Sequence, residues 1–136
     1  MTRISQEVAN AGLDAGLDLI DVGAGTNGTL ELRTGSAPTN ISDAATGTLL
    51  ATIDLAATAF GAASSGSASA NGTPLETTAG ASGTIGYGRV LDADGNPRID
   101  EDDVGTSGNN ITVNTTEVVS GATVTVNSFT VSQPFN

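Results

Sequence analysis

The sequence contains no cysteine, histidine, lysine or tryptophan. Without histidine, cysteine and lysine, the chain cannot form a serine–histidine dyad, a thiolate nucleophile or a Schiff base. A pair of carboxylates of the glycosidase type is formally possible, but such sites usually carry aromatic platforms for sugars. This chain has only one tyrosine and three phenylalanines. We therefore expect that the protein is not an enzyme.

Positive charge is nearly absent as well. The four arginines, Arg3, Arg33, Arg89 and Arg98, face 15 acidic residues, which gives a formal net charge of -11. Nucleic acids and anionic membrane surfaces both bind through clustered cations, so neither is an expected partner. A strongly negative surface instead keeps many copies of a protein apart until they dock specifically.

Long apolar runs are also missing, both at the start of the chain and within it. We therefore expect neither a signal peptide nor a transmembrane helix, and a protein made and soluble in the cytoplasm. The length of 136 residues fits one domain. Large apolar side chains are sparse for a domain of this size, so we expect oligomerisation or docking on a larger assembly.

One helix is predicted, between Ser5 and about Asp21. Apolar residues recur there at helical spacing in two sets, Val8, Ala11 and Ala15, and Leu13, Leu17 and Ile20. Gly12 and Gly16 each weaken this helix by about 1 kcal/mol relative to alanine. They also leave room for another backbone to approach closely.

The rest of the chain has the composition of short strands and turns. Alternating apolar residues predict strands over 30–33, 49–55, 65–70, 85–91, 110–119 and 122–131. A change of alternation in the last of these predicts a bulge near Asn127-Ser128. Two segments, 36–48 and 72–83, are polar and glycine-rich and are predicted to be long loops.

These elements predict a mostly β fold, an antiparallel sandwich or jelly-roll-like domain with one N-terminal α-helix. Residues 1–22 form the N-terminal helical segment and residues 23–136 the β-sandwich, within a single domain overall. Gly23-Ala-Gly25-Thr-Asn-Gly28 matches a dinucleotide-binding fingerprint by letter only. It follows a helix and precedes a strand, the reverse of the required order, so we interpret it as a loop that ends the helix.

An acidic segment near residue 95 allows two interpretations. Asp92, Asp94, Asn96 and Asp100 are candidate calcium ligands, since calcium takes six to eight hard oxygens. However, Gly95 lies at the fourth position of the segment, not at the sixth as in an EF-hand. The alternative is a hairpin, with an Asp-Gly-Asn-Pro turn and a short strand around Ile99. The sequence favours the hairpin, and no cofactor is predicted.

Several segments together suggest a family. The chain has Gly28-Thr-Leu30-Glu-Leu32-Arg-Thr34-Gly35 after the helix, then a strand from Arg89 to Gly95 of the form Arg-Val-Leu-Asp-x-Asp-Gly, and a C-terminal strand from Val124 to Val131. In this order of elements, it resembles the small virion proteins encoded in the structural modules of tailed bacteriophages. The resemblance covers nearly the whole chain, although each motif is of low complexity.

The resemblance implies a non-catalytic structural protein of the virion, a head decoration (cement) protein. Such a protein would be made in the host bacterial cytoplasm and would bind the outside of the major capsid protein lattice as a homo-oligomer, a trimer. A tail, baseplate or fibre component is the alternative, and a calcium-dependent binding module is a further one. The candidate interface residues are Arg3, Ile4, Val8 and Leu13. The competing interpretation is that the helix only covers the core of its own domain.

Overall fold

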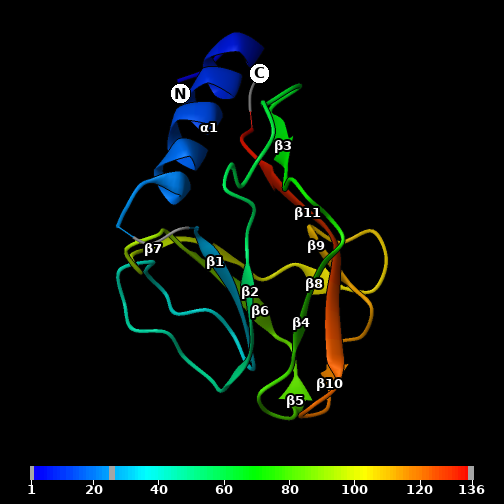
Figure 1. Cartoon of the computed structure of the whole chain (residues 1–136). Coiled ribbons are helices and arrows are strands. Elements are labelled where there is room, and N and C mark those ends of the chain that lie inside the picture. The colour runs from blue at the N-terminus through cyan, green and yellow to red at the C-terminus, as the bar shows by residue number, and fades with distance from the viewer. Residues whose placement is uncertain (1, 25–26, 135–136) are drawn as a thin grey trace.

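The computed structural model describes residues 2–24 and 27–134. Helix α1 (Gln6–Asp18) is followed by a 3-10 turn (Leu19–Asp21), and the remaining elements are strands (Figure 1). Ser5 caps the helix, because its Oγ accepts a hydrogen bond of 3.2 Å from the backbone N–H of Val8. The predicted N-terminal helix is confirmed.

The first sheet has four antiparallel strands. Its strand order is β2-β1-β6-β7, and the strands are β1 (Thr29–Arg33), β2 (Leu49–Asp54), β6 (Tyr87–Leu91) and β7 (Pro97–Glu101). Strands β6 and β7 form the predicted hairpin around Ile99, with its turn at residues 92–96.

The second sheet is built around the long C-terminal strand, and a small two-stranded sheet lies beside it. The strands are β3 (Ser67–Ser69), β4 (Leu75–Thr78), β8 (Val104–Gly105), β9 (Ile111–Val113) and β11 (Thr123–Ser132), with β5 (Gly83–Thr84) and β10 (Glu117–Val118) in the small sheet. Strands β3, β4 and β9 each pair with β11 in antiparallel fashion. Strands β8 and β9 pair in parallel, unlike the other described strands.

Strand β11 contains the predicted bulge. Its register against β9 shifts between Val126 and Ser128, so Val126 and Phe129 both reach the core although their spacing is odd. The predicted strand over 110–119 is interrupted after Val113, because the side chain of Asn114 bonds to the backbone of β11 there. The Oδ1 atom of Asn114 accepts from the N–H of Thr125 at 3.0 Å, and the side-chain amide of Asn114 donates to Thr123 O at 3.3 Å.

The loop predicted over 72–83 is wrong in part, because this segment contains β4 and the first of the two residues of β5. Strand β4 is polar, but it pairs along its whole length with β11 from Leu75 to Thr78. The segment 36–48 contains no helix or strand, as predicted. Strand β3 is shorter than the predicted strand over 65–70.

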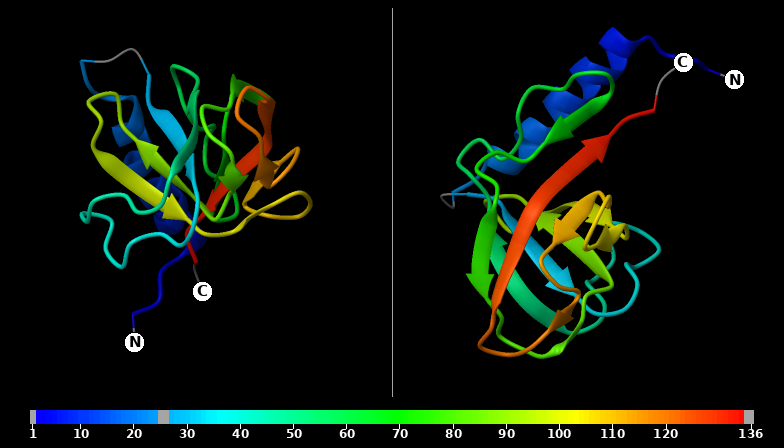
Figure 2. Two further views of the ribbon diagram at one scale, coloured as in Figure 1. Left: turned by 90° about the horizontal axis from the view of Figure 1, so that it is seen from below. Right: turned by 90° about the vertical axis from the view of Figure 1, so that its right-hand side faces the viewer.

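The core lies between the sheets and extends beneath the helix. Leu17 and Ile20 of the helical segment belong to the same buried cluster as residues of both sheets. Phe60 and Phe129 meet edge to face, with ring centroids 5.2 Å apart and an interplanar angle of 74°. Figure 2 shows the helix running beside the end of β11, away from most of the strands. The predicted mostly β, sandwich-like fold with one N-terminal helix is confirmed.

Two glycines are required by close packing between these elements. A Cβ atom at Gly28 would collide with the side chain of Ile20 and come within 2.9 Å of Leu91 O. One at Gly88 would lie 2.7 Å from Cδ1 of Ile111. Because Gly28 has no side chain, the chain can pass directly against the end of the helical segment. This close contact fixes that end of the helical segment to the first sheet.

Candidate docking surface

Helix α1 and the 3-10 turn that follows it carry two apolar stripes, of which only one is buried. The buried one, named here the core stripe, consists of Ala9, Leu13, Leu17 and Ile20. Leu17 is 5% exposed and Ile20 is 0% exposed, while Leu13 packs partly buried against the same cluster. Residues three and four apart share a helix face, so these positions form one continuous strip toward the core.

The second stripe lies beside the first and faces outward. This open stripe consists of Val8, Gly12, Ala15, Gly16 and Leu19. Val8 is 56% exposed and Leu19 is 47% exposed. A Cβ atom built on Gly12 or Gly16 would meet no atom within 4 Å. No packing inside this chain therefore requires a glycine at either position.

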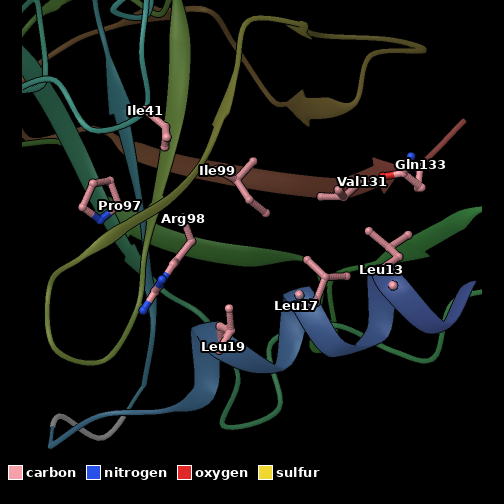
Figure 3. Close-up of a pocket in the computed structure, with 11 residues that line it drawn as sticks. Leu13, Leu17, Leu19, Ile41, Pro97, Arg98, Ile99, Val131 and Gln133 are labelled. Atoms are coloured by element: carbon pink, nitrogen blue, oxygen red, sulfur yellow. The ribbon is translucent and has the colours of Figure 1, made fainter. Parts of the chain in front are cut away.

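An apolar groove of about 420 Å³ runs along the open stripe (Figure 3). One wall is the helix, with Gly12, Leu13, Gly16, Leu17 and Leu19, and the other consists of Ile41, Pro97, Arg98, Ile99, Val131 and Gln133. Figure 3 shows Leu13 and Leu17 directed from the helix toward Val131 on β11. The groove thus brings together the helix, the β7 edge, the end of β11 and the 36–48 loop.

Arg89 holds the 36–48 loop against the first sheet. Its side chain is buried and forms a two-pronged ion pair with Asp100, with Nε–Oδ1 at 2.8 Å and Nη2–Oδ2 at 2.9 Å. The same guanidinium donates to the backbone carbonyls of Asp43 at 2.9 Å and Ile41 at 3.4 Å. The hydrogen bond to Asp100 raises the pKa of Arg89 further, so this charge is permanent.

Tyr87 fixes the same loop at a second point. Its hydroxyl donates to Thr46 O at 2.8 Å and accepts from the N–H of Thr46 at 3.0 Å. Because both anchors are buried side chains of β6, the loop has a defined path despite its polar composition. Ile41, which is 40% exposed, is consequently held in the lining of the groove.

Asp92 organises the hairpin turn that precedes β7. It is 4% exposed, and its Oδ1 accepts from the N–H groups of Asp94 and Asn96, both at 2.9 Å. Its Oδ2 accepts from the side chain of Asn96 at 3.2 Å and pairs with Arg98 at 2.8 Å. Burial by itself raises the pKa of Asp92, but these donors outweigh it and lower the pKa to about 2.

The four candidate calcium ligands are not gathered into one site. The oxygens of Asp92 accept from the turn and Arg98, Asp94 Oδ1 accepts from the N–H of Ala24 at 2.7 Å, and Asp100 pairs with Arg89. Asn96 serves as a donor to Asp92. Within residues 2–24 and 27–134, no group of three or more acidic side chains could hold a metal ion. The geometry gives calcium binding no support.

The acidic residues at the end of β7 and after it likewise bond within the chain. Asp103 accepts hydrogen bonds from the side chain of Asn109 at 2.8 Å and the N–H of Asn110 at 2.9 Å. These two donors lower its pKa. Glu101 accepts from the side chain of Asn110 at 2.9 Å. These carboxylates therefore shape the turn before β9.

The four candidate interface residues have different surroundings. Arg3 and Val8 are exposed, Ile4 is half-buried, and Leu13 lies between the core and the groove. Within the predicted Gly23–Gly28 loop, residues 25 and 26 lie outside the described residues. Leu19, Ile41, Ile99 and Val131 line the groove but are not among the candidates from the sequence. Ile41 is the one with a visible signal, as an isolated large apolar residue in a polar loop.

Most of the positive charge is neutralised within the chain. Arg33 pairs with Glu31 at 3.1 Å, and Arg89 and Arg98 pair with Asp100 and Asp92. Arg3 forms no ion pair with the described residues. Since the sequence has 15 acidic residues, the field around the molecule is negative.

Comparisons with protein-family models, with curated proteins and with solved structures gave no match. Among the helices of the described residues, none is long and apolar enough to cross a membrane.

Proposed function

We propose that this chain is a non-catalytic structural protein of a tailed-phage virion, a head decoration (cement) protein. In this role it binds the outside of the major capsid protein lattice, as a trimer, and stabilises the shell. The family resemblance of the sequence suggests the virion, and one structural observation supports a docking role. That observation is the apolar groove beside an incompletely covered helix.

The polar interior also suits a docking protein better than a catalyst. Every buried side-chain nitrogen or oxygen among the described residues has a hydrogen-bond partner. The buried charges of Arg89 and Asp92 are each used to hold a loop or turn in place. Such groups stabilise a surface of fixed shape, and they are not free to transfer protons to a substrate.

The negative charge supports an exterior position on the shell. A protein that faced packaged DNA would need cations against the phosphates, and this chain has four arginines, three of them paired internally. On the exterior, the same charge keeps unbound copies apart.

A decoration protein of this kind stabilises its partner by mass action. If it binds the expanded lattice and not the unexpanded one, each bound copy shifts the shell toward the expanded state. No chemical step is needed, only a surface that matches the lattice in one of its states.

Location and copy number in purified particles test the proposal. We expect many copies, in fixed proportion to the capsid subunits, by quantitative mass spectrometry, with density on the shell exterior by electron cryo-microscopy. A few copies with density at the tail would indicate the tail, baseplate or fibre alternative. Absence from particles would contradict a virion role.

A further inference from the structure

We propose that the groove between α1 and β7 is the docking site for an apolar, cation-flanked segment of a different protein chain. This inference deepens the proposed function, because it names the surface that contacts the partner and the chemistry of what it contacts. It rests on the shape of the groove, on the charge of the molecule and on two glycines that no contact within the chain requires.

The lining of the groove calls for an apolar occupant. Leu13, Leu17, Ile99 and Val131 are among its apolar lining residues. Arg98 is the charged lining residue, and its pairing with the buried carboxylate of Asp92 at 2.8 Å neutralises it locally. A partner gains most here by inserting aliphatic side chains, which displace water from apolar surface.

The exposed apolar residues extend this surface beyond the groove. Leu19 and Ile41, at 47% and 40% exposed, line the groove, and Val8 and Val22, at 56% and 63%, lie on or directly after the helical segment. Scattered exposed apolar residues are ordinary, but these four border one hollow or the helix that walls it. A segment lying along the groove would cover several of them together.

Gly12 and Gly16 allow such a segment to approach the helix backbone closely. Both line the groove, and a Cβ atom at either would meet nothing within 4 Å. Glycine inside a helix lowers its stability, and no contact within the chain requires glycine at these two positions.

Charge decides between the possible occupants. Two copies of this chain would each bring a formal charge of -11, with three of the four arginines already paired. Like charges oppose insertion of an acidic segment from a second copy into this groove, whereas a segment flanked by lysine or arginine is attracted. The groove is therefore assigned to a cationic segment of another protein, and the contacts of the proposed trimer to a different surface.

Nuclear magnetic resonance can test this with the full chain and a defined probe. The probe is a synthetic helical peptide with leucine and alanine on one face and lysine along both flanks. Its control carries glutamate in place of each lysine. We expect saturable shifts of the amide signals of Gly12, Gly16, Ile41 and Ile99 with the lysine peptide. The glutamate peptide should bind at least about tenfold more weakly.

Two variants of the same helix sharpen the assignment. Gly16→Leu places a side chain in the groove and should weaken binding at least about tenfold. Ala11→Leu changes an exposed position outside the groove lining and should leave binding unchanged. Both variants replace a small residue by a good helix former, so loss of folding is not expected from either.

Three results would overturn the proposal. They are the absence of a saturable shift, shifts confined to another surface, or equal effects of the two variants. Self-association of the chain alone that Gly16→Leu abolishes would assign the groove to a second copy instead. The proposed function fails separately, if the unmodified chain is absent from particles. Full particle occupancy by Gly16→Leu would contradict only the groove.

Discussion

The two apolar stripes of α1 are adjacent on one helix, yet they have opposite surroundings. The core stripe ends in Leu17 and Ile20, which are buried against both sheets. The open stripe contains Gly12 and Gly16 and ends in Leu19, which is 47% exposed. Burial of the core stripe attaches the helix to the domain. The comparison indicates that the core stripe serves folding, while the open stripe remains available for a partner.

The largest change in the free energy of unfolding is expected at Arg89, which holds the loop that carries Ile41 of the groove wall. Arg89→Met removes one partner of a buried ion pair and leaves Asp100 and two loop carbonyls without their donor. We predict a loss of about 3–5 kcal/mol in the free energy of unfolding, measured by urea denaturation. Arg3→Met, which alters an exposed arginine, should change it by less than about 0.5 kcal/mol. Equal effects would show that the Arg89 anchor does not stabilise the fold.

The comparison between the stripes can be made directly with two neighbouring residues. Ile20→Ala deletes a fully buried side chain of the core stripe and should cost about 2–4 kcal/mol. Leu19→Ala, in the open stripe, should cost about 0.5 kcal/mol or less. The measurement is again the free energy of unfolding. A cost at Leu19 similar to that at Ile20 would mean that both stripes serve the fold.

Acid should weaken the turn that presents β7 to the groove. The pKa of Asp92 is lowered from 3.8 to about 2 in the folded chain, so its contribution is fully present above the unfolded value. It is lost as the pH falls from about 4 through about 2, and amounts to about 2 kcal/mol. Asp92→Asn should flatten this part of the stability curve relative to the unmodified chain. An unchanged slope in the variant would contradict the role assigned to Asp92.

The last prediction is a small increase in stability, where the preceding variants lower it. Gly16→Ala should stabilise the free protein by about 0.5–1 kcal/mol, because alanine favours the helix and its Cβ meets no atom within 4 Å. Gly28→Ala is the contrasting variant and should destabilise, since its Cβ would collide with Ile20. Thermal unfolding of both proteins measures the difference. Destabilisation by Gly16→Ala would reveal a packing role for this glycine within the chain.

Much of the fold is predictable from local patterns in the sequence. The helix follows from its apolar spacing and the capping Ser5, and the β6–β7 hairpin follows from turn residues between two short apolar runs. The bulge in β11 follows from the change of alternation near residue 127. In each case the signal lies within one element and its immediate neighbours.

The elements that were missed depend on residues far apart in the chain. Strand β4 has little apolar character of its own and exists through its pairing with β11, about fifty residues later. The break after β9 depends on Asn114, whose side chain bonds to the backbone of Thr123 and Thr125. Neither of these long-range contacts can be predicted from the periodicity of apolar residues in the sequence.

The groove is the clearest example of a feature that depends on residues far apart in the chain. The sequence indicates an apolar helix with two glycines, but the opposite wall is assembled from three distant segments. Ile41 lies there because Arg89 and Tyr87 hold its loop, and these contacts span more than forty residues. Of the candidate residues Arg3, Ile4, Val8 and Leu13, Leu13 lines the groove, and none lies on its second wall.

The most direct test of a docking role for the open stripe is the particle occupancy of two variants of one helix. Gly16→Leu fills the groove, whereas Ala11→Leu adds the same side chain outside its lining. Quantitative mass spectrometry of purified particles gives the copy number of each relative to the capsid subunits. We predict that Gly16→Leu is strongly depleted while Ala11→Leu matches the unmodified chain. Equal, undiminished occupancy of both would contradict the assignment of the groove.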